Sequence, residues 1–354
     1  MITEENKDEA FKLTGYSHGA GCGCKISPAD LENILSGTKE ETYKKLLIGN
    51  HTNDDAAVYS MDDHSAFIAT TDFFTPIVDD AFDFGRIAAA NAISDIYAMG
   101  GKPILALAIL GWPIGKLPLS LAKKVIEGAK EICLEAGIPL AGGHSIDTTE
   151  PLFGLSVNGL LEIKNLKRND GAQEGDLILI TKAIGTGILS TAVKRAVVEE
   201  SHEKKLVQQL ITLNKAGEAL SSLDGVHAMT DITGFGLAGH LIEMCTGSGL
   251  SASITYQKIP LMEGVQSYLE KRIIPDATYR NWNSYSSKIS FGKGVNVMEA
   301  FSVLPDPQTN GGLMLAIAPE ALPAVQKILK EYACYTGDPI GIFTQSGDKM
   351  IEVH

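Results

Sequence analysis

The chain has 354 residues, of which 44% are hydrophobic and 21% charged, and its formal net charge at pH 7 is −13. The excess of acidic residues argues against nonspecific nucleic-acid binding, which needs clustered lysine and arginine. No apolar run is long enough to span a bilayer, residues 1–11 do not resemble a secretion signal, and five cysteines without paired spacing fit a reducing compartment. We therefore expect a cytoplasmic protein of about two domains, without a membrane or nucleic-acid partner.

A glycine-rich stretch with two thiols, residues 17–25, comes first and is called the arm below. It holds Cys22 and Cys24 among glycines and ends at Lys25. Glycine lets backbone amides wrap an anion, and a nearby ammonium favours a nucleophilic thiolate. These features predict a mobile catalytic arm, with a flexible lead-in or a zinc or copper site as alternatives. A short helix is expected to follow, with Ser27 as N-cap and Pro28 in its first turn.

Acidic side chains follow at the ends of predicted strands. Residues 50–55 form a polar turn before a strand at 56–59, and a second strand at 67–71 runs into Asp72. The period of apolar residues over 83–99 predicts a helix that ends at a glycine pair, with Asp95 among its apolar positions. Asp95 either points outward to a distant arginine or binds a metal, and the neighbouring acids favour the metal.

The first block continues with a strand at 104–110, a helix at 119–136 and a strand at 138–141. That strand is followed by Gly142, Gly143, His144 and Ser145, which predict a small polar loop suited to phosphate or nucleotide contact. A strand at 153–161 closes the block. The charged, turn-rich residues 162–175 are the best candidate for a domain boundary.

The second block again interleaves strands and helices. Strands are expected at 176–181 and 313–317, a helix at 322–332, and a strand, turn and helix around Asp231. Residues 234–239 spell the dinucleotide fingerprint, but the acidic residue required about 20 positions later is absent. The chain has no Walker-type phosphate loop, so an ATP site would be of another design, and an acidic protein that binds polyphosphate needs Mg²⁺.

Taken together, these stretches resemble the selenophosphate synthetase (selenide, water dikinase) family, within the wider group similar to aminoimidazole ribonucleotide synthetase. The resemblance rests on residues 18–25, 54–58, 71–74, 91–103, 141–147, 229–236 and 306–309. It implies an α+β fold of two domains, each a mixed β-sheet packed with helices, whose N-terminal domain pairs into a dimeric β-barrel. We expect the arm and lead helix in residues 1–49, the ATP- and Mg²⁺-binding domain at 50–161, a linker at 162–175 and the C-terminal domain at 176–354.

The resemblance also implies a reaction, in which selenide, ATP and water give selenophosphate, AMP and phosphate. By position, Cys22 corresponds to the catalytic cysteine or selenocysteine and Lys25 to the essential lysine, while Asp55, Asp95 and Asp231 correspond to Mg²⁺ ligands. The implied nucleotide contacts are Lys25, Thr52, Asn53, Asp54, Asp72, Asp95, Gly143, His144 and Ser145, the last three reaching ATP across the interface of a homodimer.

Two departures from the family pattern are visible, because Asn53 stands where related sequences often carry arginine and Asn310 replaces a small serine. Two rival interpretations stay open at this point. An enzyme similar to thiamine-phosphate kinase would need the acidic residues but neither Cys22 nor Lys25. A non-catalytic thiol carrier of selenium or metal would need the cysteines alone, and a selenium-delivery protein is a partner compatible with the enzyme.

Overall fold

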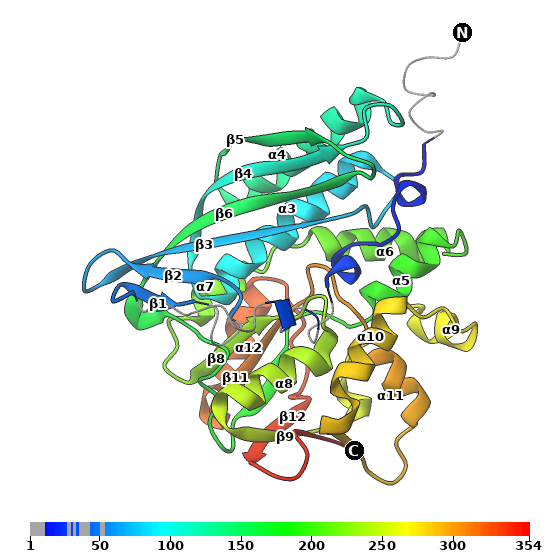
Figure 1. The fold of residues 1–354 in the computed structure, drawn as a ribbon. Coiled ribbons are helices and arrows are strands. Elements are labelled where there is room, and N and C mark those ends of the chain that lie inside the picture. Colours follow the sequence, from blue (N-terminus) through cyan, green and yellow to red (C-terminus); the bar gives the residue numbers. More distant parts are fainter. Residues whose placement is uncertain (1–10, 27–29, 31–32, 35–42, 50–53) are drawn as a thin grey trace.

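The structure is a computed structural model that describes residues 11–26, 30, 33–34, 43–49 and 54–354 (Figure 1). The expected lead helix, Thr52 and Asn53 therefore lie outside the described residues, apart from a few positions of the helix. Two short 3-10 helices, η1 (Leu13–Tyr16) and η2 (Cys22–Cys24), precede the first strand. Within the described part, no helix is both long and apolar enough to cross a membrane.

The N-terminal half forms a six-stranded sheet in the order β1-β2-β3-β6-β4-β5. Strands β4 and β5 pair in parallel and the other neighbours are antiparallel, so the sheet is mixed as expected. The strands are β1 (Leu46–Ile48), β2 (Ala57–Ser60), β3 (Ser65–Phe74), β4 (Lys102–Trp112), β5 (Leu140–Asp147) and β6 (Leu152–Glu162).

One face of this sheet is covered by α3 (Ala81–Ala98) and α4 (Leu119–Ala136), as Figure 1 shows. Asp80 is the N-cap of helix α3, and its side chain accepts the Asp83 backbone N–H at 2.7 Å. Gly137 adopts a left-handed conformation, with φ of 76°, and ends α4 where the sequence predicts. A Cβ on Gly85 would lie 1.9 Å from the Val125 carbonyl oxygen, so glycine is required where the two helices cross.

The C-terminal half forms a seven-stranded mixed sheet in the order β10-β13-β9-β12-β7-β11-β8. Its strands are β7 (Leu177–Ile180), β8 (Val226–Asp231), β9 (Leu250–Ile254), β10 (Ile289–Phe291), β11 (Leu313–Ile317), β12 (Gly341–Gln345) and β13 (Ile351–Val353). Its helices are α5 (Thr186–Lys194), α6 (Glu200–Ile211), α7 (Ala216–Leu220), α8 (Gly236–Ser248), α9 (Val265–Glu270), α10 (Asp276–Tyr285), α11 (Val297–Val303) and α12 (Leu322–Glu331).

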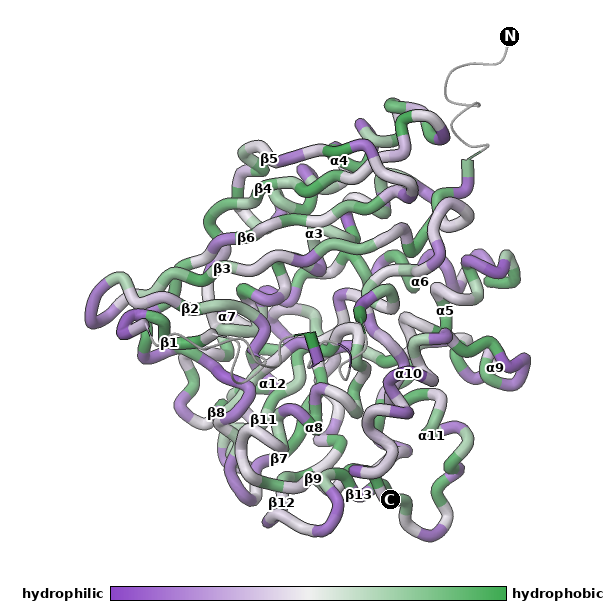
Figure 2. Tube along the Cα trace, in the orientation of Figure 1, coloured by the Kyte–Doolittle hydropathy of each residue, from purple (hydrophilic) through white to green (hydrophobic). Residues whose placement is uncertain are grey.

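The two halves share apolar contacts across their boundary. The core under the N-terminal sheet continues from α3 into α5 and α6, which bury Ile188 and Leu206, respectively. Figure 2 shows hydrophobic residues along β4 and β6 and hydrophilic residues in the hairpin between β2 and β3. Helix α3 is consequently buried on almost every side, between its own sheet and the C-terminal half. Polar side chains on α3 can therefore act at the junction of the two halves.

The segment that the sequence predicts to be a loop, Gly142 to Ser145, instead lies inside strand β5. The reason is the close pairing of β5 with β4. Gly143 has φ of 153°, and a Cβ there would lie 2.1 Å from the Ala108 carbonyl oxygen. Gly143 thus permits a close strand contact, and the stretch does not form a phosphate-binding turn.

Candidate active site

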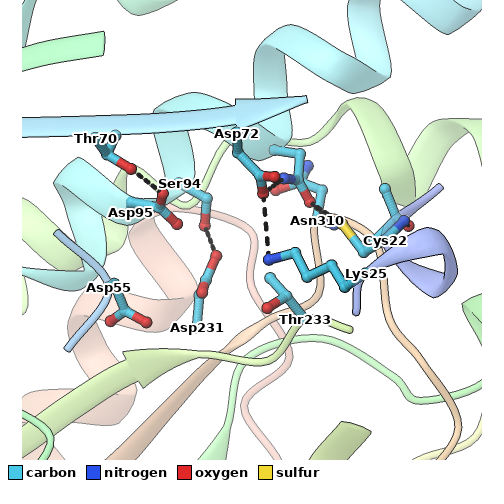
Figure 3. A network of polar contacts seen from close by, with 12 residues as sticks. Cys22, Lys25, Asp55, Thr70, Asp72, Ser94, Asp95, Asp231, Thr233 and Asn310 are labelled. Atoms are coloured by element: carbon cyan, nitrogen blue, oxygen red, sulfur yellow. Dashed lines mark hydrogen bonds and ion pairs between the residues drawn. The ribbon is translucent and has the colours of Figure 1, made fainter. Parts of the chain in front are cut away.

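Six of the residues singled out by the sequence meet between the two halves of the chain (Figure 3). Asp72 lies on β3 and Asp95 on α3, whereas Asp231 is the last residue of β8 in the C-terminal sheet. Asp55 precedes β2, and the arm brings Cys22 and Lys25 to the same place. The structure therefore gathers the two arm residues and four predicted aspartates around one point.

Each of three aspartates accepts a hydrogen bond from a neighbouring hydroxyl group. Thr70 Oγ1 donates to Asp95 Oδ2 at 2.5 Å, and Ser94 Oγ donates to Asp231 Oδ2 at 2.5 Å. Thr230 Oγ1 donates to Asp55 Oδ1 at 2.8 Å. These hydroxyl groups orient the carboxylates but carry no charge to neutralise them.

Burial raises the pKa of Asp55 and of Asp95 well above the usual range, and the charge of Asp231 raises both further. Burial also raises the pKa of Asp231. A cation bound among the three would remove this repulsion.

The Oδ2 atom of Asp55 is buried without a hydrogen-bond partner in the part of the chain that the structure describes, which fits a missing metal contact. As they stand, no three His, Cys, Asp or Glu side chains among the described residues are arranged to hold an ion. The chemistry of the donors suits Mg²⁺, and binding would require the carboxylates to turn toward the ion.

Lys25 forms an ion pair with Asp72, with its Nζ 3.6 Å from Asp72 Oδ2. Burial lowers the pKa of Lys25, but Asp72, Cys22, Asp95 and Asp231 together more than offset this, and its pKa lies well above the usual value. The side chain therefore stays an ammonium group, available to an incoming phosphate.

Cys22 is fully buried, and its Sγ donates to Asn91 Oδ1 at 3.3 Å. Burial, and then the charge of Asp72, raise the pKa of this thiol well above its usual value although Lys25 lowers it. The expectation that Lys25 makes Cys22 a thiolate is therefore wrong for this arrangement, because burial and Asp72 outweigh the lysine. The thiol is protonated here.

Asn91, which the sequence analysis did not assign to the site, links the thiol to the carboxylates. Its Oδ1 accepts the Asn310 backbone N–H at 2.7 Å in addition to the Cys22 thiol, and its Nδ2 donates to Asp72 Oδ2 at 2.5 Å. The signal that could have found it is a polar residue at a buried position of α3, the same signal that identified Asp95.

A loop of the C-terminal half, residues 306–309, holds the arm by a hydrogen bond. Cys22 N donates to Thr309 Oγ1 at 2.9 Å. The neighbouring Gln308 Oε1 accepts the Gly185 and Thr186 backbone N–H groups at 3.1 and 3.2 Å, which ties the loop to the start of α5. Buried Asp306 accepts the Gly187 N–H at 3.1 Å, and burial raises its pKa to about 8. In the sequence, residues 306–309 contribute to the family resemblance, but their pattern predicts no role for them.

The arm itself is packed in this structure rather than extended. Gly21 N donates to the Thr75 carbonyl oxygen at 3.0 Å, forming an isolated bridge with the chain beyond β3. Cys24 is exposed and lines a cleft of about 710 Å³ on the outer side of the arm, whereas Cys22 faces inward. The mobility expected from the glycines stays a prediction.

Three predicted nucleotide contacts do not join the cluster within one chain. Gly143, His144 and Ser145 are exposed on β5, at the edge of the N-terminal sheet (Figure 1). Asp54 lies nearer the cluster and accepts the Asn169 backbone N–H at 2.8 Å.

Comparison with known proteins gives full-length matches. The model of the AIR synthase related protein N-terminal domain matches residues 53–161, and that of the C-terminal domain matches residues 173–354. The chain is 50% identical over 345 residues to the selenide, water dikinase of Sulfurovum sp. strain NBC37-1, covering 97% of this chain and 99% of that protein. It is 49% identical over 349 residues to the selenide, water dikinase of Aeromonas salmonicida, with 97% and 99% covered.

Among solved structures, thiamine-monophosphate kinase from Stenotrophomonas maltophilia superposes with a TM-score of 0.63 at 18% identity, covering 93% of this chain and 96% of that one. This likeness supports the expected two-domain α+β fold. The matches to the two dikinases each cover 97% of the chain at about half identity. The chain therefore belongs to the selenide, water dikinase family, within the AIR synthase related proteins.

Proposed function

We propose that this protein makes selenophosphate from selenide, ATP and water, with release of AMP and phosphate. The observation that carries the proposal is the ion pair between Lys25 and Asp72, in the same cluster that buries the Cys22 thiol. Phosphoryl transfer depends on positioning and on neutralising charge, and a lysine brought by a glycine-rich arm to a cluster of aspartates supplies both.

The aspartates divide into two roles. Asp55, Asp95 and Asp231 hold Mg²⁺, which when bound neutralises the polyphosphate of ATP. Asp72, together with Thr52, Asn53 and Asp54 of the preceding turn, contacts the nucleotide. The raised pKa values of the three metal ligands support this division, and so does Asp55 Oδ2, which has no hydrogen-bond partner among the described residues.

The arm residues act on the transferred group. Lys25 steadies the γ-phosphoryl group while selenide attacks it, forming the Se–P bond and leaving ADP. Cys22 holds or delivers selenium, and Asn91 orients the thiol. Water then attacks the β-phosphorus of ADP, which yields AMP and phosphate. Both steps need the arm to cover the site, so that ADP does not leave between them.

The active form is a homodimer in the cytoplasm. Phe73, Leu107, Ile146 and Leu160 share the face of the N-terminal sheet opposite α3, where they are 48%, 39%, 56% and 39% exposed. An apolar sheet face of this kind needs a cover, and the same face of a second copy provides one. Pairing there would let Gly143, His144 and Ser145 reach the nucleotide of the partner.

Phosphorus NMR of the protein with ATP, Mg²⁺ and selenide under anaerobic conditions tests the proposal. Selenophosphate and AMP are expected together, and Cys22→Ala and Asp95→Asn should each lose both. Formation of ADP without any selenium-bound phosphorus overturns the proposal. Full ATP turnover by Cys22→Ala would mean that selenide is not the substrate.

A further inference from the structure

Lys194, at the C-terminal end of α5, donates three hydrogen bonds from its ammonium group to the arm. Its Nζ donates to the backbone carbonyl oxygens of Ser17, His18 and Gly19 at 2.8, 2.9 and 2.9 Å. A lysine has three N–H donors, so these bonds leave none for a substrate. The side chain therefore acts on the arm and does not act as a ligand for phosphate.

The contact falls just before the reactive part of the arm. Gly19 is followed within three residues by Cys22, whose backbone is held on the inner side by Thr309. Further along, Arg280 Nη2 donates to the Gly23 carbonyl oxygen at 2.8 Å from α10. Lys194 and Arg280 thus hold the backbone on both sides of Cys22, from two helices of the C-terminal half.

A second contact secures the same stretch from the other half. The His18 backbone N–H donates to Glu150 Oε2 at 3.1 Å, and the His18 ring also contacts the Glu150 carboxylate. Residues 17–19 are consequently fastened to both halves of the molecule. Because all three carbonyl oxygens belong to the backbone, only a change of Lys194 itself removes its part of this anchor.

We propose that Lys194 is a positioning residue that fastens the base of the arm, so that Cys22 and Lys25 stay over the site during both phosphoryl steps. The inference rests on the proposed function for its catalytic consequence, but not for its structural one. When the anchor is lost, the arm opens more often, which exposes the Cys22 thiol and lets ADP escape before water cleaves it.

The structural part is tested by the rate at which iodoacetamide alkylates Cys22, followed by mass spectrometry of the arm peptide. Cys24 is exposed and should react readily, whereas Cys22 is buried and should be protected in the wild type. Lys194→Met keeps the length of the side chain but removes the three donors. If this destabilises the closed arm by about 1.4 kcal/mol relative to the open arm, the alkylation rate of Cys22 rises about tenfold. Lys194→Arg keeps a charged donor and is expected to restore most of the protection.

Arg195→Ala is the matched control. Arg195 is the next residue, is exposed on the same cleft, and makes no hydrogen bond to the described part of the arm, so its loss should leave Cys22 protected. The buried thiols of Cys133 and Cys245 report on unfolding in the same sample, since they react only if the fold opens. Protection of Cys22 in Lys194→Met equal to that in the wild type overturns the inference.

The catalytic part is tested by the ratio of ADP to AMP released per turnover with ATP, Mg²⁺ and selenide. This ratio should rise about tenfold in Lys194→Met, in step with arm opening, and return toward the wild-type value in Lys194→Arg. An unchanged ratio alongside faster alkylation overturns the claim that the anchor retains ADP. If the wild type forms no selenophosphate, the proposed function fails, while the alkylation rates still decide whether Lys194 fastens the arm.

Discussion

A single methyl group on Gly21 should separate the arm from the site. Gly21 has φ of 52° and ψ of −148°, a backbone conformation that residues other than glycine rarely adopt. A Cβ there would lie 2.4 Å from Thr309 Oγ1 and 2.6 Å from Ile77 Cδ1. Thr309 Oγ1 is also the acceptor of the Cys22 N–H, so the methyl group displaces the contact that seats the thiol.

The expected magnitude follows from the backbone conformation. Holding a non-glycine residue in a disallowed region costs about 1–3 kcal/mol. If that cost falls on the packed arm, its population drops by a factor of about 5 to 150 relative to open forms, before the clash with Thr309 is counted. Gly21→Ala should therefore form AMP at least about fivefold more slowly, and its Cys22 should be alkylated faster by a similar factor.

Gly23→Ala is the control, because it changes the same arm with different geometry. A Cβ on Gly23 would come no closer than 3.6 Å to any atom, the Pro307 Cγ, which is an ordinary contact. Rates of AMP formation near those of the wild type are expected. Equal losses of AMP formation in both variants would mean that the reaction depends on the general flexibility of the arm glycines. Full activity in Gly21→Ala would mean that the packed arm is not the catalytically active arrangement.

Three further predictions concern the charges and the sheet face. Asp55→Asn should weaken the apparent Mg²⁺ affinity by about tenfold or more, seen as a smaller Mg²⁺-induced rise in melting temperature; an unchanged rise would remove Asp55 from the metal site. Burial lowers the pKa of Lys182 to about 7 from the usual 10.5, so between these values the unfolded chain binds more protons than the folded one, and Lys182 makes stability increase with pH. In urea unfolding, the free energy of unfolding of the wild type minus that of Lys182→Met should therefore grow from pH 7 to pH 9 by at most about 1.4 kcal/mol per pH unit. A difference that stays constant over this range would contradict the lowered pKa of Lys182. Leu107→Glu should yield monomers in sedimentation experiments, whereas Leu134→Glu, on the exposed side of α4, should remain dimeric; a dimeric Leu107→Glu would place the interface elsewhere.

Local patterns in the sequence were sufficient where an element carries its own start and stop signals. Helix α4 spans Leu119–Ala136 as predicted, because an amphipathic period ends at a glycine that can adopt positive φ. The same reasoning failed at Gly142 and Gly143, because two glycines indicate a turn when read alone. Only the neighbouring strand β4 shows that Gly143 permits close pairing instead.

The candidate site was predictable in its acidic residues and not in what connects them. Asp95 stood out because a carboxylate within an apolar helix needs a partner. Asn91 also lies on α3, but its role depends on the Asn310 backbone and on the arm, which come from distant parts of the chain. The protonated state of Cys22 depends on burial, which the nearby lysine in the sequence does not reveal. Lys194 binds backbone carbonyl oxygens, so its partners leave no pattern of side chains to read.

The central claim is that this site sends the terminal phosphoryl group of ATP to selenium and the next one to water. A single turnover with ATP labelled by radioactive phosphorus in the γ position, carried out with selenide and Mg²⁺ without oxygen, tests this most directly. The label should appear in selenophosphate, while the orthophosphate and AMP formed with it stay unlabelled. Label found in orthophosphate, with selenophosphate unlabelled or absent, would contradict the account.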